Sequence, residues 1–222
     1  MFIGHYAVAM AAKRAAPKTS LGTLILAAQF VDLLWPLFLL LGLEHVRIAP
    51  GSTAVAPLDF YDYPYSHSLL SAFAWAAAFG IVYFVAQRSS RGAWVAALCV
   101  LSHWLLDYVV HRPDLPLWPG SPILEGLGLW NSVFWTVTLE LGMFVAGTLI
   151  YVHFTRTKDR TGIIALYAFC AVLVLIYAAN LLGPPPPSVF AIAIAGNLGW
   201  LFVLWGYWID RHRAVTGQAV AA

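Results

Sequence analysis

Charged residues are scarce in this sequence, and that scarcity excludes most classes of soluble protein. Only 10% of the 222 residues are Asp, Glu, Lys or Arg, and 61% are hydrophobic, whereas about a quarter of a typical soluble domain is charged. The net charge of +2 comes from loop residues and does not indicate a nucleic-acid partner. The composition predicts an integral membrane protein surrounded by membrane lipid.

Cysteine is equally rare. Cys99 and Cys170 are the two cysteines of the chain, and both fall inside apolar runs. We interpret them as small apolar side chains rather than as a disulfide. A metal site in this protein would therefore be built from imidazole and carboxylate groups, without thiolates.

Long apolar runs dominate what is present. A helix needs roughly 20 residues to cross hydrocarbon, and six runs reach that length: 21–43, 67–86, 93–110, 131–154, 162–183 and 189–209. Residues 1–12 are apolar but too short to span, and their positive charges follow the apolar stretch, unlike those of a signal peptide. We predict an all-α polytopic membrane protein with six transmembrane helices and a short N-terminal helix that dips into the membrane. Residues 1–222 form a single domain.

The basic residues predict the orientation. Of the twelve Lys and Arg residues, ten fall in loops on one side, and only Arg47 and Arg112 fall on the other. The positive-inside rule then places both termini in the cytoplasm of a bacterial inner membrane. The loops 44–66 and 111–130 face outward, and we expect them to pack together as an outer cap.

Ionisable residues recur at helical spacing in the third run. His103, Asp107 and His111 are four residues apart in "SHWLLDYVVH", so a helix places them on one stripe. Pro113 disfavours helix at the residue before it, which ends the stripe. Such groups are costly in hydrocarbon, and the default interpretation is a partnered functional cluster.

Other apolar segments carry ionisable residues at matching depth. Asp32 lies mid-way along the first run, Glu140 nine residues into the fourth, and His67 opens the second. At about 1.5 Å per residue, Asp32, Glu140 and His103 project to one band below the outer surface. His5, in a helix that dips from the cytoplasmic side, reaches about the level of Asp32. These groups are expected to surround one site that opens outward.

Imidazole and carboxylate ligands suit zinc, with manganese and iron as alternatives. The candidate metal ligands are His5, Asp32, His67, His103 and Asp107. They exceed what one tetrahedral ion needs, so two ions are plausible. The alternative is structural. Isolated histidines in spans are often hydrogen-bonded core residues, Asp32 can accept from backbone donors freed by Pro36, and Glu140 can pair with a histidine as a buried clamp.

Several short motifs resemble the bacterial membrane-bound metal-dependent hydrolase family, the YdjM-like, LexA-regulated inner-membrane proteins. They are "GH" (4–5) in the N-terminal helix, "YSHSLL" (65–70), "SHWLLD" (102–107) and "PLWP" (116–119), within residues 1–140. The family looks distantly similar to zinc-dependent phospholipase C. The resemblance implies an all-helical fold with a His/Asp metal site.

Residue by residue, the resemblance implies metal binding by His5, His67, His103 and Asp107. Asp32, in "VDLLWP", takes the place of the family's acidic "PD" motif. Tyr63 stands where the family's "HRGxTHS" has its first histidine. Either Asp59 or Asp62 replaces that ligand, or one metal is lost.

These observations predict a metal-dependent hydrolase that acts on a lipid-borne ester, a phosphoester first, at the outer membrane face. Asp62, Asp59 or Glu140 would act as general base, and His111 and Arg112 would steady a phosphate. One alternative is a non-catalytic subunit of a larger membrane complex. The other is a transporter or proton relay, which the sequence disfavours because it shows no repeat and no matching broken helix.

Overall fold

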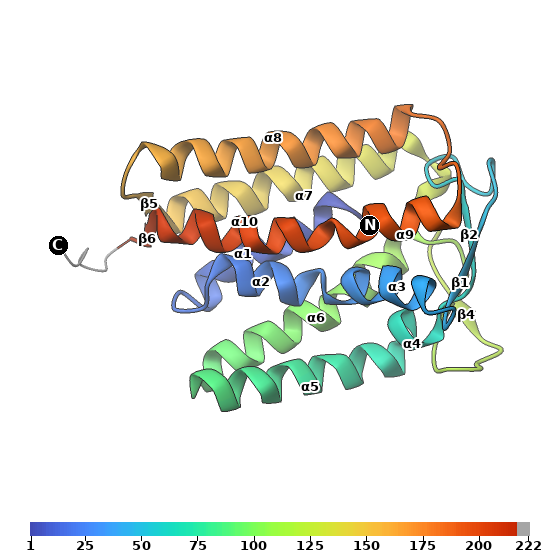
Figure 1. The fold of residues 1–222 in the computed structure, drawn as a ribbon, viewed down its shortest axis with the longest axis horizontal. Coiled ribbons are helices and arrows are strands. Elements are labelled where there is room, and N and C mark those ends of the chain that lie inside the picture. Colours follow the sequence, from blue (N-terminus) through green and yellow to red (C-terminus); the bar gives the residue numbers. More distant parts are fainter. Residues whose placement is uncertain (217–222) are drawn as a thin grey trace.

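Most helices lie side by side along the long axis of the molecule (Figure 1). The structure, a computed structural model, describes residues 1–216. Its α-helices are α1 (Ile3–Ala15), α2 (Leu21–Ala28), α3 (Phe30–Leu40), α4 (Pro64–His67), α5 (Leu69–Gln87), α6 (Ser90–Val110), α7 (Val133–Phe154), α8 (Arg160–Leu182), α9 (Val189–Asn197) and α10 (Gly199–Arg211). A short 3-10 helix, η1 (Leu129–Asn131), precedes α7.

Within residues 1–216, three short antiparallel strand pairs lie between or after the helices, where the all-α prediction has none. They are β1 (His45–Ile48) with β2 (Leu58–Asp62), β3 (Leu115–Pro116) with β4 (Leu124–Glu125), and β5 (Thr155–Thr157) with β6 (Arg213–Val215). These strands are too short to carry a hydrophobic run, so the apolar pattern of the sequence does not reveal them. The chain remains mostly helical.

Five helical stretches are long and apolar enough to cross a membrane. They are α5, α6, α7, α8 and the stretch Val189–Arg211 that contains α9 and α10. The bent pair of α2 and α3 makes a sixth if it counts as one span. This pattern agrees with the predicted membrane-protein class.

Side-chain caps fix where several of these helices begin. The hydroxyls of Ser89 and Ser132 accept hydrogen bonds from the backbone N–H groups of Gly92 and Trp135. Such caps satisfy N–H groups that a helix start leaves without a partner. α6 therefore begins at Ser90, before the start of the apolar run 93–110, and α7 begins at Val133, inside the run 131–154.

The first apolar run is broken, which corrects the expectation of one unbroken span over 21–43. α2 and α3 meet at 56°, and Gln29 between them has φ −99° and ψ 4°. At this break the Ala28 carbonyl accepts a hydrogen bond from the His103 imidazole. Pro36, the irregularity visible in the sequence, lies further on, inside α3.

The second apolar run also begins differently from the prediction. His67 ends the short helix α4 instead of opening the span. Ser68 then adopts an extended conformation, with ψ 150°, and caps α5 by accepting from the Ser71 N–H. This change of direction separates His67 from the span and turns it toward the centre of the bundle.

The N-terminal helix α1 is a core element. Ile3, Ala9 and Met10 are completely buried, and α1 packs against α2, α6 and α7. A Cβ at Gly147 of α7 would lie 2.4 Å from the carbonyl oxygen of Ala7, so α7 approaches α1 closely only because this residue is glycine. The N-terminus lies part-way along the bundle (Figure 1).

The loops 44–66 and 111–130 lie together at one end of the bundle (Figure 1). We call these two loops the cap. Arg112 forms an ion pair with Asp59, and the rings of Phe60 and Trp130 lie 6.1 Å apart. The predicted packing of the two loops is confirmed. The opposite end carries the C-terminal ends of α1, α5 and α10, the starts of α6 and α8, and the strands β5 and β6 (Figure 1). Most of the basic residues belong to these segments or adjoin them: Lys13, Arg14, Lys18, Arg88, Arg91, Arg156, Lys158, Arg160, Arg211 and Arg213.

Candidate metal centre

The five predicted ligands meet inside the bundle although they come from four different helices. His5 is on α1, Asp32 on α3, His67 on α4, and His103 and Asp107 on α6. Two overlapping groups have their ligand atoms within 4.8 Å of one another: His5 with His103 and Asp107, and Asp32 with His67 and His103. The prediction that His67, His103 and Asp107 lie close together is confirmed.

Two histidine nitrogens face two carboxylate oxygens at the centre of this cluster. Nε2 of His103 lies 3.1 Å from Oδ2 of Asp107 and 3.5 Å from Oδ1 of Asp32. Nε2 of His67 lies 3.7 Å from the same Asp107 oxygen and 3.6 Å from the same Asp32 oxygen. The four atoms thus form one compact group.

The other ring nitrogen of His103 fixes which way that imidazole is protonated. Nδ1 lies 2.9 Å from the Ala28 carbonyl oxygen, which can only accept, so Nδ1 carries a proton. In the neutral ring Nε2 then presents a lone pair. This buried Nε2 has no hydrogen-bond partner among the described residues 1–216, although two carboxylate oxygens face it.

Residues of the cap orient the ring of His67 as Ala28 orients that of His103, with Nδ1 hydrogen-bonded and Nε2 toward the carboxylates. Nδ1 of His67 lies 2.6 Å from the hydroxyl of Ser66, and that hydroxyl donates to Oε2 of Glu44 at 2.6 Å. Glu44 is 1% exposed. Sequence reasoning missed Glu44, because its position directly after an apolar run is typical of an exposed loop residue.

These separations are compatible with a shared divalent ion. Zinc binds histidine nitrogen and carboxylate oxygen at roughly 2.0–2.1 Å, which places neighbouring ligand atoms of a tetrahedral site about 3.3 Å apart. The four nitrogen–oxygen separations, from 3.1 to 3.7 Å, lie close to that value. Where imidazole nitrogens face carboxylate oxygens in a buried site, a proton or a metal cation must lie between them, and this donor set suits a divalent ion.

His5 joins the cluster through the second oxygen of Asp107. Its Nε2 lies 3.2 Å from Oδ1 of Asp107, and its ring stacks on that of His103 at 3.8 Å. The backbone nitrogen of Met1 lies 2.5 Å from the same Oδ1. Asp107 therefore links α1 to the two central histidines.

Glu140 lies beside the cluster and serves α1. Its Oε2 accepts hydrogen bonds from the backbone N–H groups of Phe2 at 2.8 Å and Gly4 at 3.3 Å. Glu140 is 1% exposed. A carboxylate at this position satisfies N–H groups at the start of the helix and interacts favourably with its dipole. The partners that Glu140 has among the described residues are backbone groups at the start of α1, not the histidine of the buried-clamp alternative, and its role as general base stays a prediction.

Asp59 and Asp62 lie in the cap, where each has a basic partner. Asp62 accepts from the imidazole of His45 at 2.8 Å at the surface. Asp59 pairs with Arg112, and an Arg47 nitrogen lies 3.9 Å away. Neither aspartate belongs to the two candidate ligand groups within residues 1–216. Their assignments as general base or replacement ligand stay predictions.

His111 and Arg112 belong to a polar network above the cluster. Asp114 accepts from the Tyr63 hydroxyl at 2.8 Å and lies 2.9 Å from Nδ1 of His111 and 3.3 Å from Nε of Arg112. Burial raises the pKa of Tyr63 well above its usual value, so its hydroxyl remains a donor. Burial lowers the pKa of His111, which favours a neutral ring. The predicted role of His111 and Arg112 in phosphate binding is untested.

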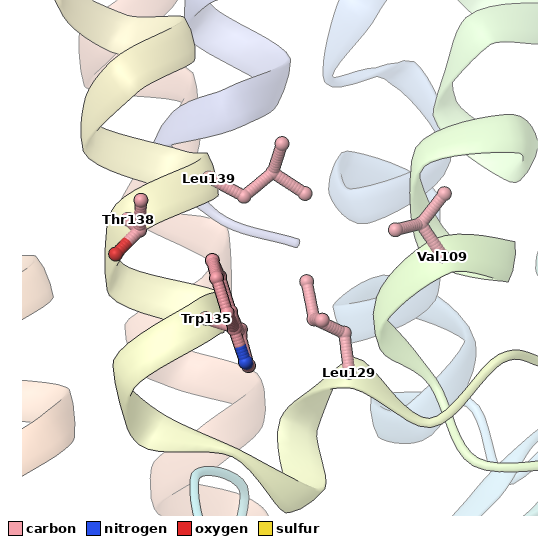
Figure 2. A pocket seen from close by; sticks show the side chains of 5 residues that line it. All are labelled: Val109, Leu129, Trp135, Thr138 and Leu139. Atoms are coloured by element: carbon pink, nitrogen blue, oxygen red, sulfur yellow. The ribbon is translucent and has the colours of Figure 1, made fainter.

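Asp32 is the most exposed residue of the cluster. The side chain of Asp32 is 35% exposed, whereas those of His67, His103 and Asp107 are 5% exposed or less. A hollow between α6 and α7 is lined by Val109, Leu129, Trp135, Thr138 and Leu139 (Figure 2). None of these residues is titratable, so the chemistry of the molecule is concentrated in the buried cluster.

No protein-family model, curated protein or solved structure matches this chain. The evidence on function is therefore the geometry of the chain itself.

Proposed function

We propose that the chain is a metal-dependent hydrolase of a bacterial inner membrane that acts on a lipid-borne ester. The preferred substrate class is a phosphoester. The observation that carries this proposal is the group of two imidazole nitrogens and two carboxylate oxygens that face one another at 3.1 to 3.7 Å. His67, His103, Asp32 and Asp107 would hold the ion, zinc before manganese or iron. A divalent ion there supplies Lewis acidity toward an ester oxygen and makes water acidic enough to react near neutral pH.

The residues of the chain divide the remaining work. Asp32 is the most exposed of these ligands, so a substrate would approach the cluster from the side of Asp32. His5 supports Asp107 from below, and Glu140 secures the start of α1. The lipid surroundings of the helices would supply the substrate directly from the membrane.

In the proposed topology α2 and α3 form one bent span, giving six spans, and α1 enters from the cytoplasmic side. The basic end, with the end of α10, faces the cytoplasm, Met1 lies within the bundle, and the cap faces outward. The charge distribution supports this arrangement, because ten of twelve basic residues share one end and cytoplasmic loops carry an excess of Lys and Arg.

Cysteine labelling tests that orientation. In a variant without Cys99 and Cys170, a membrane-impermeant maleimide added to intact cells is expected to label Ser52→Cys and Ser121→Cys. Ser89→Cys, in the connection between α5 and α6, should react only after the cells are permeabilised. The reverse pattern would invert the topology.

Hydrolysis by purified protein tests the proposed activity. In vesicles that contain a fluorescent glycerophospholipid, we expect product release that stops with a chelator and returns with zinc. Asp107→Asn should fall to background, because Asp107 contacts both central histidines, whereas His153→Gln, on the exposed surface of α7, should remain active. Bound metal without hydrolysis of any lipid ester would favour the non-catalytic subunit.

A transporter is the second candidate, because the broken first span places half-helix ends near buried charged groups. The tight packing between the cluster and the basic end argues against a transporter. Tyr6, Met10 and Leu24 there are 3% exposed or less, and Lys13 is bound to Asp210 at 2.7 Å. Such packing closes that side, so a site that opens at one end only is favoured.

A further inference from the structure

We infer that Glu44 and Ser66 form a relay that holds His67 in the tautomer required for metal binding, and that Glu44 is a positioning residue of the centre. The inference rests on the proposed metal site. It concerns Glu44, which lies outside every motif, and Ser66, to which no motif assigns a role, and its chemistry follows from the direction of each hydrogen bond.

Glu44 is a buried carboxylate with three donors. Its Oε1 accepts from the backbone N–H groups of Tyr65 at 2.8 Å and Ser66 at 2.7 Å, and its Oε2 accepts from the Ser66 hydroxyl at 2.6 Å. The two backbone groups belong to α4, the helix that ends in His67. Glu44 itself follows α3, which carries Asp32. The carboxylate therefore ties together two elements that each supply a ligand.

The direction of the hydrogen bonds fixes the proton on His67. A serine hydroxyl has one proton, and here the carboxylate of Glu44, which can only accept, takes it. At the 2.6 Å contact between Ser66 Oγ and His67 Nδ1, the proton must then come from the imidazole. Nδ1 is protonated, so in the neutral ring Nε2 carries the lone pair and faces Asp32 and Asp107.

A second partner of this kind normally matters to a metal site. A carboxylate or hydroxyl on the far nitrogen of a ligating histidine fixes its tautomer and raises its basicity, and its loss typically weakens metal binding about 10–100-fold. The Ala28 carbonyl fixes the tautomer of His103 in the same way, by accepting a hydrogen bond from its Nδ1. Because a backbone carbonyl cannot be mutated away, the Glu44–Ser66 pair is the one open to a test.

Ser66→Ala, Ser66→Thr and Glu44→Gln separate the relay from a packing role. Ser66→Ala is expected to weaken Zn²⁺ binding about 10–100-fold, and Ser66→Thr, which keeps a hydroxyl, should restore it. In Glu44→Gln the side-chain NH₂ would donate to Ser66, so the hydroxyl would turn its proton toward Nδ1 and leave Nε2 protonated. We expect that variant to bind Zn²⁺ at least as weakly as Ser66→Ala.

Ser68→Ala is the matched control. Ser68 lies on the other side of His67 and caps α5 through the Ser71 N–H, with no part in the relay. Its loss should lower the melting temperature while leaving Zn²⁺ affinity unchanged. A common weakening in Ser68→Ala and Ser66→Ala would show a packing effect and overturn the relay.

The tautomer can be read without metal. In metal-free protein with ¹⁵N-labelled histidine, assigned with a His67→Gln variant, the His67 signal should be that of a ring protonated at Nδ1, and Glu44→Gln should change it to Nε2. A wild-type ring protonated at Nε2, or wild-type Zn²⁺ affinity in Ser66→Ala and Glu44→Gln, would overturn the inference. Failure of the wild-type protein to bind Zn²⁺ would overturn the proposed function instead, and the tautomer measurement would still test the relay.

Discussion

His103→Ala is expected to abolish the stabilisation that zinc confers on the purified protein. Among the imidazole nitrogens of the cluster, Nε2 of His103 lies nearest to both carboxylates, at 3.1 Å from Asp107 and 3.5 Å from Asp32. A ligand present at about 100 times its dissociation constant stabilises a protein by about 2.7 kcal/mol. For a chain of this size that is a rise of roughly 5–10 °C in melting temperature, which differential scanning fluorimetry in detergent measures.

His153→Ala is the control for that measurement. His153 is exposed near the end of α7 and packs edge-on against Phe154. Its variant should keep the full zinc-dependent rise. A full rise in His103→Ala would remove His103 from the centre, and with it the proposed ligand geometry.

Gly147→Val is expected to displace the N-terminal helix α1 from its packing against α7. The added Cβ would lie 2.4 Å from the Ala7 carbonyl oxygen, and neither backbone can move without separating α1 from α7. Overpacking of this kind costs about 1–3 kcal/mol or more. His5 is part of α1, so a displaced α1 moves this proposed ligand. Zinc affinity should therefore fall together with the melting temperature.

Gly142→Val is the matched control on the same helix. A Cβ at Gly142 has no neighbour within 4 Å, so the stability change should stay within about 0.5 kcal/mol. Equal stability of the two valine variants would mean that α1 lies outside the bundle, as an anchor at the membrane surface.

The helical repeat made the centre of the site predictable. His103 and Asp107 are one turn apart, so any helix through this segment places both on one face. The cost of burying charge in an apolar run identified Asp32, His67 and His5 as well. Hydropathy likewise located the long helices, because their length is set by the membrane and not by their neighbours.

What the sequence could not predict depends on contacts between distant segments. The break at Gln29 coincides with a contact between Ala28 and His103, which lie 75 residues apart. Glu44 resembles a loop residue until α4 folds back onto it. Tyr63 is buried with its hydroxyl on Asp114, a pairing across the cap that no local pattern reveals.

Metal content decides whether the buried cluster is a metal centre. Elemental analysis of the detergent-purified protein is expected to find at least about one equivalent of zinc, manganese or iron per chain, as a four-ligand site requires. Excess chelator should remove it, and His67→Ala should lack it. Folded wild-type protein that carries none of these metals, and takes up none when they are supplied, would contradict the proposed centre.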